Sequence, residues 1–167
     1  MAKSSRVVEL YLLRHADAGD PDAWTGDDDV RPLSDKGVRQ AERLGRHLAV
    51  IGFEPDLILA SPKVRASQTA EIVAAAIGGS VTTDDGLAGG VGLASIERLL
   101  RDHGEPRRAV LVGHDPDFSD LLATLVGAPT LQMKKGALAR VDLESGLQAG
   151  AAVLRWLIPP DALPREA

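Results

Sequence analysis

The hydrophobic positions of the chain form two patterns that alternate along its length. Continuous runs occupy residues 7–13, 56–60 and 109–112, with a brief one at 81–83. Continuous runs of Val, Leu and Ile of this length are typical of strands that are covered on both faces. This pattern predicts three buried strands and one short strand, and the stretches between them show the spacing of amphipathic helices.

The first predicted helix follows Ser34, which is a favourable N-cap residue. Leu33 and Val38 are placed to pack against each other across this cap, and Gly52 stands where a C-cap glycine is expected. Apolar residues recur at helical spacing between the two caps. The predicted apolar face consists of Val38, Ala41, Leu44, Leu48 and Ile51.

Three further helices are predicted at residues 61–77, 93–103 and 115–126. Ser61 is the expected N-cap of the first of them, and Asp115 is the expected cap of the last. A proline follows each of these two caps, at the first helical position. Glycines that end the three helices are Gly78, Gly104 and Gly127.

Two more strands are predicted at residues 138–143 and 152–158, on either side of a turn-like sequence, and they form a hairpin or an extended version of one. The residues after Pro160 are expected to be a tail. Buried strands that alternate with amphipathic helices indicate an α/β fold. We therefore expect a three-layer α/β/α sandwich with a mostly parallel sheet, in a single domain of residues 1–167.

Length and charge agree with one globular domain and exclude several classes of function. The chain has 167 residues, the usual size of a single domain. Its 19 Lys and Arg against 24 Asp and Glu give a formal net charge of −5, the wrong sign for a protein that mainly binds nucleic acid. The absence of cysteine excludes disulfides, thiolate zinc sites and cysteine nucleophiles. Any anionic ligand must be held by a local cluster of positive groups.

Nothing in the sequence predicts a membrane partner. No apolar run approaches the roughly 18 residues of a membrane span. The run after the basic residues 1–6 contains Glu9 and ends at Arg14, so it is too short and too charged for a signal peptide. We expect a cytoplasmic protein, with a monomer as the default state.

Polar residues stand where three of the predicted strands end. Arg14 and His15 follow the first strand, and His114 follows the strand at 109–112. Ser61 follows the second strand, with Arg65 one turn into the next helix. Ligands of parallel sheets bind beyond these ends, and guanidinium groups and helix N-termini suit phosphate. One imidazole can attack phosphorus while a second, protonated one binds an equatorial oxygen, so the pattern favours phosphoryl chemistry without a metal or cofactor.

The two remaining histidines are expected to be structural. His47 falls on the polar side of the first helix, and His103 ends the third, where a partly cationic imidazole favours the helix dipole. The four histidines lack close pairing, and no dense carboxylate cluster accompanies them. A dinuclear metal site is therefore not expected.

Four motifs resemble those of the histidine phosphatase (phosphoglycerate mutase-like) superfamily, and within it the SixA-type phosphohistidine phosphatases. They stand in the family order and cover most of the chain. The motifs are Leu-Leu-Arg-His-Ala at 12–16, Arg-Pro-Leu-Ser at 31–34 with Gly37, Ser-Pro-Lys-Val-Arg-Ala at 61–66 with Gln-Thr-Ala at 68–70, and Val-Gly-His at 112–114. The short length, the Arg-Pro-Leu-Ser element and the absence of a large inserted lid point to the SixA-type branch.

The resemblance implies a phosphoglycerate mutase-like fold and a role for each matched residue. It implies that His15 is the nucleophile, that Arg14 and Arg65 clamp the phosphate, and that His114 is the second imidazole. The sequence departs from the family at Ala16, where glycine is usual. Within the same motifs, Ser61 and Arg31 are expected to contact substrate.

The general acid remains open between Asp17 and the pair Asp84 and Asp85. Asp17, two residues beyond the expected nucleophile, resembles an acid of SixA-type sequences and is the preferred candidate. A site without a well-placed acid favours phosphohistidine, because histidine leaves as a neutral imidazole whose conjugate acid has a pKa of about 6.5.

The resemblance implies an open pocket but does not identify the substrate. A phosphorylated protein of the histidine phosphotransfer type is the first expectation, and a small phosphomonoester is the second. A non-catalytic module that binds a phospho-ligand is a third, and a mutase is the least favoured. The loops at 20–29 and 86–92 are expected to border the pocket and select substrate. Trp24 either contacts substrate at the lip or covers an edge of the core.

Overall fold

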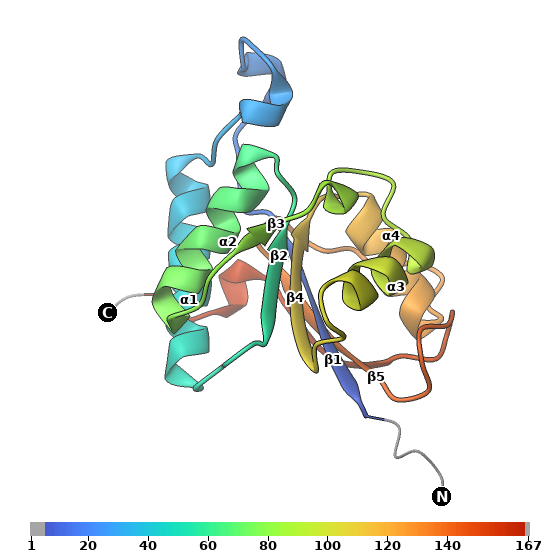
Figure 1. The fold of residues 1–167 in the computed structure, drawn as a ribbon. Helices are drawn as coiled ribbons and strands as arrows, with labels where there is room; N and C mark the ends of the chain where they lie inside the picture. Colours follow the sequence, from blue (N-terminus) through green and yellow to red (C-terminus); the bar gives the residue numbers. More distant parts are fainter. Residues whose placement is uncertain (1–5, 166–167) are drawn as a thin grey trace, which may run out of the picture.

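A six-stranded sheet forms the centre of the computed structural model, which describes residues 6–165 (Figure 1). The opening residues 1–5, which belong to the segment weighed above as a signal peptide, lie outside the described residues. The strand order is β3-β2-β4-β1-β5-β6. The first four strands are parallel, and β5 is antiparallel to both of its neighbours, so the expectation of a mostly parallel sheet is confirmed. The strands are β1 (Val8–Arg14), β2 (Leu57–Ala60), β3 (Thr82–Thr83), β4 (Arg108–Gly113), β5 (Leu138–Leu143) and β6 (Val153–Ile158).

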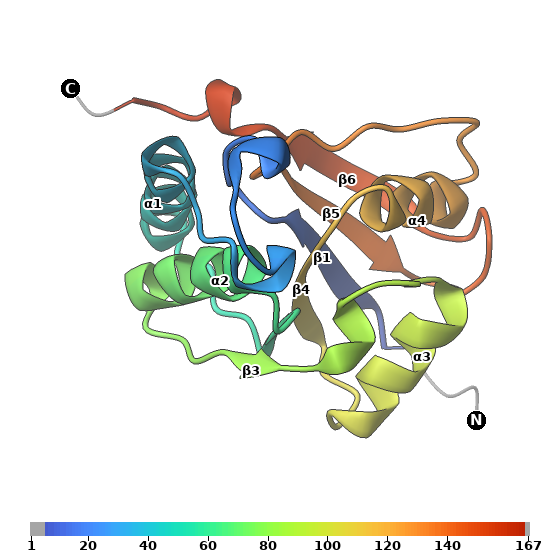
Figure 2. The ribbon, with the colours of Figure 1, turned by 90° about the horizontal axis from the view of Figure 1, so that it is seen from above.

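Helices cover the sheet on both sides, which confirms the three-layer α/β/α architecture (Figure 2). The helices α1 (Asp35–Val50) and α2 (Val64–Ile77) lie on one face. The helices α3 (Leu93–Asp102) and α4 (Asp117–Val126) lie on the other. Across residues 6–165, no helix combines the length and the apolarity that crossing a membrane requires.

Alternate side chains of each central strand enter opposite cores. In β1, Leu10 and Leu12 belong to the core under α3 and α4, and Tyr11 and Leu13 belong to the core under α1 and α2. Successive side chains of a strand point to opposite faces of a sheet. A strand buried on both faces must therefore be apolar throughout, which explains the continuous runs in the sequence.

The start of α1 is as the sequence predicts. The Ser34 hydroxyl accepts a hydrogen bond from the Gly37 N–H at 3.1 Å. Of the predicted apolar face, Ala41, Leu44 and Leu48 are buried, and Val38 is partly buried. Ile51 is an exception, because it lies beyond the last turn and is 56% exposed.

Two other predicted helix starts need correction. The helix α2 begins at Val64 rather than after Ser61, and its N-cap residue Lys63 makes no side-chain cap bond. The helix α4 begins two residues after Asp115. The Asp115 carboxylate nevertheless accepts the Ser119 N–H at 3.1 Å, so it still binds a free N–H of the first turn.

The expected loop at residues 16–31 contains short structure. Two single 3-10 turns lie within it, Pro21–Ala23 and Asp28–Val30. We call residues 19–31 the arm, because they project from the carboxyl edge of the sheet (Figure 1). Trp24 lies on the arm, 38% exposed, where its indole N–H donates to the Asp27 carbonyl, and it belongs to none of the described core clusters.

The expected tail after Pro160 is partly packed. Pro160 opens a 3-10 turn and is buried. Leu163 is also buried and belongs to the core under α1 and α2. Residues 160–163 are therefore part of the fold rather than a tail.

Candidate active site

The three polar strand ends meet at the carboxyl edge of the sheet. The strands β2, β4 and β1 are neighbours, and the hydrogen-bond ladder continues one residue beyond them. The His15 N–H donates to the Gly113 carbonyl and the Ser61 N–H donates to the Val112 carbonyl, both at 2.9 Å. This continuation sets His15, Ser61 and His114 side by side, at the place where α/β folds bind ligands.

His15 is buried and keeps one ring nitrogen free. Its Nδ1 lies 2.7 Å from the Ala16 carbonyl oxygen. Because a carbonyl only accepts, Nδ1 carries the proton and Nε2 holds the lone pair of the neutral ring. Burial, together with the nearby charges of Arg65 and Arg14, lowers the pKa of His15 to about 4. The ring is therefore neutral at pH 7, with an unprotonated Nε2.

His114 is the second imidazole of the site, with its ring centre 5.2 Å from that of His15. Its Nε2 lies 2.7 Å from the Ser61 Oγ, which also accepts the Lys63 N–H. The Ser61 hydroxyl can thus donate to Nε2, which leaves the proton of the neutral ring on Nδ1. Burial and the neighbouring His15 lower the pKa of His114 to about 3, so this ring is also neutral at pH 7, which corrects the expectation of a protonated second imidazole.

Both candidate clamp arginines are held at their outer ends. The Arg14 Nη1 donates to the Met133 carbonyl at 2.7 Å and lies 3.4 Å from the Asp115 carboxylate. The Arg65 Nη1 donates to the Asp28 carbonyl at 2.8 Å, and its Nη2 lies 3.1 Å from the carboxylate of the same residue. Each guanidinium is thus fixed by one carbonyl and one carboxylate.

Three buried nitrogens of the site have no hydrogen-bond partner among residues 6–165. They are the Nε of Arg14, the Nε of Arg65 and the Nδ1 of His114. A buried donor without a partner costs free energy, so native proteins contain few of them. Three donors from the three strand ends match the several acceptor oxygens of a phosphoryl group.

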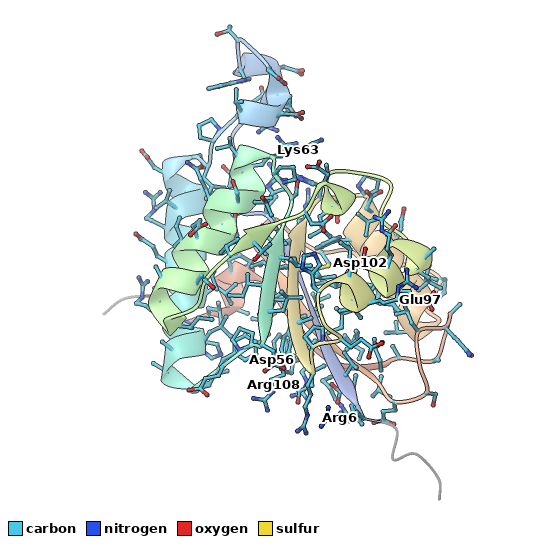
Figure 3. The ribbon with its side chains drawn as sticks, viewed as in Figure 1. Arg6, Asp56, Lys63, Glu97, Asp102 and Arg108 are labelled. Carbon is cyan, nitrogen blue, oxygen red and sulfur yellow. The ribbon has the colours of Figure 1, made fainter. Side chains whose placement is uncertain are left out.

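Positive side chains gather at this end of a protein whose net charge is negative, and each of them is paired with a carboxylate. Lys63 lies close below the arm, whereas Asp56 and Arg108 lie at the opposite end of the sheet (Figure 3). Lys135 is near enough to lower the pKa of His15, together with the two arginines. The local cluster of positive groups that an anionic ligand requires is therefore present.

The contacts of Asp17 argue against the role of proton donor expected for it. Its carboxylate accepts the Ser34 hydroxyl at 2.6 Å and the Gly19 N–H at 3.2 Å, and Lys135 lies 3.3 Å away. These partners, Ser34 first, lower the pKa of Asp17, so the group is ionised at neutral pH. Asp17 instead joins the strand end to the start of α1.

The alternative acids are not better placed. The Asp84 carboxylate lies 2.9 Å from the His103 Nε2 and accepts the Gly86 N–H. The bond from His103 lowers the pKa of Asp84, which is therefore also an anion at neutral pH. Asp85 is exposed at the start of a 3-10 turn. The contact with Asp84 agrees with the structural role expected for His103.

Ser61 and Arg31 are both buried and bonded within the protein, and their contact with substrate stays a prediction. Ser61 is fully buried and contacts His114. Arg31 is buried too, with its Nε donating to the Asp28 carboxylate and its Nη1 to the Ala18 carbonyl. Asp28, which contacts both Arg31 and Arg65, is the residue that the sequence analysis missed. Within the described residues, no group of three or more His, Cys, Asp or Glu is arranged to hold a metal ion.

The two buried histidines predict a pH dependence of stability. Both titrate near pH 6.5 in the unfolded chain but only near 4 and 3 in the folded protein. Between pH 6.5 and 4 the unfolded state binds more protons, so the free energy of unfolding falls as the pH is lowered. We expect a loss of about 3 kcal/mol for each histidine across this window. Urea unfolding at pH 7, 5.5 and 4 measures it.

A variant with His15→Asn and His114→Asn is the control for this effect. Its free energy of unfolding should change much less between pH 6.5 and 4. The carboxylates with lowered pKa also lose stability toward the acid end of this window, but they do so equally in the variant and the wild type, so the comparison cancels their effect. Equal pH dependence in the variant and the wild type would contradict the assignment to these histidines.

Comparisons with known proteins agree with this geometry. Residues 10–89, which include His15 and Arg65, match the sequence model of the histidine phosphatase superfamily (branch 1). An uncharacterized protein of Picosynechococcus sp. is 37% identical over 174 residues, which cover 91% of this chain and all of that protein.

Solved structures with the same fold include two SixA proteins. The protein histidine phosphatase SixA, in complex with tungstate, superposes with a TM-score of 0.78 at 24% identity, over 92% of this chain and 98% of that one. A protein of Nakamurella multipartitia named as a SixA phosphohistidine phosphatase gives a TM-score of 0.75 at 26% identity, over 95% and 99% of the two chains. The chain belongs to the histidine phosphatase superfamily and has the fold of its SixA-type members.

Proposed function

We propose that the protein is a phosphohistidine phosphatase, which removes the phosphoryl group from a histidine of another protein through a covalent intermediate on His15. The proposal rests on the neutral imidazole of His15, with its Nδ1 proton held by the Ala16 carbonyl and its Nε2 free. A lone pair fixed in this way can attack phosphorus without a separate base.

In the first step, the Nε2 lone pair of His15 forms a bond to phosphorus, and the bond from phosphorus to the substrate nitrogen breaks. A substrate ring that carries a proton on its other nitrogen takes up the electron pair and leaves as neutral imidazole. In the second step, water attacks phosphorus and the electron pair returns to Nε2 of His15, while a water proton goes to solvent. The Nδ1 proton stays on His15 throughout and makes it a good leaving group in this second step.

Three groups stabilise the negative charge of the phosphoryl oxygens during both steps. Arg14 and Arg65 keep their charge at every accessible pH, and their guanidinium groups match the geometry of phosphate. His114 adds a neutral N–H donor at Nδ1, because Ser61 holds its other nitrogen. Donors that are fixed in advance stabilise a transition state more than mobile ones do.

The carboxylates near the site favour phosphohistidine over a phosphate ester. An alkoxide leaving group needs a proton, whereas imidazole leaves as a neutral group. Asp17 and Asp84 are both ionised and bound to other partners, so neither is ready to supply that proton. The site is therefore better suited to a leaving group that needs no acid.

Phosphate release from two substrates tests this proposal. We expect release from a histidine-phosphorylated phosphotransfer protein to exceed release from glucose 6-phosphate by at least about 100-fold in kcat/KM, the usual contribution of a general acid. An activated aryl phosphate, whose leaving group also needs no acid, serves as the matched control and should be hydrolysed.

The other outcomes each indicate a different function. A preference for glucose 6-phosphate would contradict the proposal and indicate a phosphatase of small metabolites. Binding of inorganic phosphate with no hydrolysis of any of the three substrates would indicate a module that binds phospho-ligands. Arg14, His15, Arg65 and His114 have the chemistry that either of these functions requires.

A further inference from the structure

Asp28 joins the arm to the phosphate clamp. It is the first residue of a 3-10 turn at the base of the arm, and its side chain is 51% exposed. One carboxylate oxygen accepts the Arg31 Nε at 2.8 Å, and the other lies 3.1 Å from the Arg65 Nη2. The Asp28 carbonyl accepts the Arg65 Nη1 at 2.8 Å. One residue thus binds both outer nitrogens of Arg65.

The Nε of Arg65, by contrast, has no hydrogen-bond partner among the described residues. Arg14 is held at one outer nitrogen only, because its Nη1 contacts both a carbonyl and a carboxylate, and its Nε has no partner. Both guanidinium groups are therefore fixed from the outer side and keep an inner N–H. A long side chain fixed in this way loses less freedom when it binds a ligand.

The Arg31 side chain in turn fixes Asp28. Its Nη1 donates to the Ala18 carbonyl, three residues beyond His15, while its Nε holds the Asp28 carboxylate. The chain of contacts therefore runs from the segment after β1, through Arg31 and Asp28, to Arg65. The bond from Arg31, and the charge of Arg65, lower the pKa of Asp28 and keep it ionised.

We propose that Asp28 is a positioning residue that orients the Arg65 guanidinium for the phosphoryl group. This inference rests on the proposed function, because it takes the site to bind phosphate. Asp28 does not touch the reacting atoms and acts through Arg65 alone. The alternative role for an anion in this place is competition with phosphate for Arg65. Loss of the Asp28 charge would weaken phosphate binding in the first role and strengthen it in the second.

Binding of inorganic phosphate to Asp28→Asn separates the two roles. Loss of a negative charge beside an anion site strengthens anion binding when the charge only competes or repels. Loss of a positioning contact weakens it, because Arg65 must then be ordered on binding. We expect the Kd for inorganic phosphate, measured by titration calorimetry, to rise about tenfold in Asp28→Asn, with a similar rise in KM for an aryl phosphate.

Asp35→Asn is the matched control. Asp35 is an exposed residue of the first turn of α1, outside the loops expected to border the pocket, and its substitution changes the net charge by the same amount. We expect its Kd for phosphate to stay within about twofold of the wild-type value. Asp28→Glu, which keeps a carboxylate, should recover part of the lost affinity, and thermal melts should show that all three variants are folded.

Arg65→Ala tests whether Asp28 acts through the arginine. In that background, Asp28→Asn should produce no further change in the Kd for phosphate. Equal or tighter phosphate binding by Asp28→Asn alone would overturn the inference, and so would an undiminished tenfold loss in the Arg65→Ala background.

The proposed function and this inference fail in distinguishable ways. A wild type that binds phosphate but does not hydrolyse phosphohistidine removes the proposed function, and the Asp28 comparison still gives its answer. A wild type that neither binds inorganic phosphate nor hydrolyses any of the three substrates overturns both.

Discussion

Replacement of His15 by alanine should reduce phosphate release by at least about 10⁴-fold while the protein stays folded. The substitution removes the only atom that the covalent route can use as a nucleophile, the Nε2 of a neutral ring held by the Ala16 carbonyl. It leaves Arg14, Arg65 and His114 in place. Phosphate binding should therefore survive, and the loss should appear in kcat. Initial rates of phosphate release under saturating substrate measure it.

A second measurement tests the covalent step directly. Wild-type enzyme quenched with base during turnover should carry labelled phosphate bound to His15, because phosphohistidine survives base, and His15→Ala should carry none. His47→Ala is the control variant, since His47 lies in the last turn of α1, whereas it is the start of that helix that contacts Asp17, and it should keep the wild-type rate. Turnover in His15→Ala within tenfold of wild type would rule out the covalent mechanism.

The elements that carry the site could be predicted because the apolar runs end at the functional residues. The strands β1 and β4 stop at Arg14 and Gly113, each followed by a histidine. Alternation of the two core faces forces these runs to be apolar. The polar residues that follow them are buried as well, so they stand out because they break the apolar pattern without leaving the protein interior. The order of the strands then brings the two histidines together.

The misplaced features depend on contacts between distant residues. Ser61 has the sequence of an N-cap, yet its hydroxyl binds His114, 53 residues away, and the helix begins later. Leu163 stands among prolines and charged residues, and its burial follows from packing under α1 and α2. Local sequence patterns contain no information about such distant partners. A prediction from sequence therefore makes Ser61 the cap of the nearest helix and places Leu163 in a tail.

Asp28 could not be selected from the sequence because it is one of five aspartates between residues 20 and 29. Its spacing of three from Arg31 is compatible with a contact along a helical turn, and this is the only local signal. Its contact with Arg65 spans 37 residues. Asp17 is preferred from the sequence because it resembles an acid of SixA-type sequences, but its carboxylate accepts the Ser34 hydroxyl. Resemblance therefore ranks the acids differently from their contacts.

Replacement of Gly37 by alanine should destabilise the protein by about 3 kcal/mol, although alanine favours helices. Gly37 lies in the first turn of α1, where alanine would otherwise stabilise the helix by about 1 kcal/mol. A Cβ at this position would lie 1.9 Å from the Asp17 carbonyl oxygen, well inside contact distance. That oxygen is pinned by the Ser34 N–H at 2.9 Å, so it has little freedom to move away. The clash therefore outweighs the gain in helix propensity.

The clash should also affect the candidate active site, because Asp17 directly follows His15 and Ala16. Displacement of its carbonyl would shift Ala16, whose own carbonyl holds the Nδ1 of His15. We expect Gly37→Ala to lower both the midpoint of urea unfolding and kcat. Gly89→Ala is the control for stability, since an added Cβ there meets no atom within 4 Å, and it should leave the midpoint of urea unfolding unchanged. A Gly37→Ala variant as stable as wild type would show that the strand end and α1 can separate, and that their close contact does not fix the position of His15.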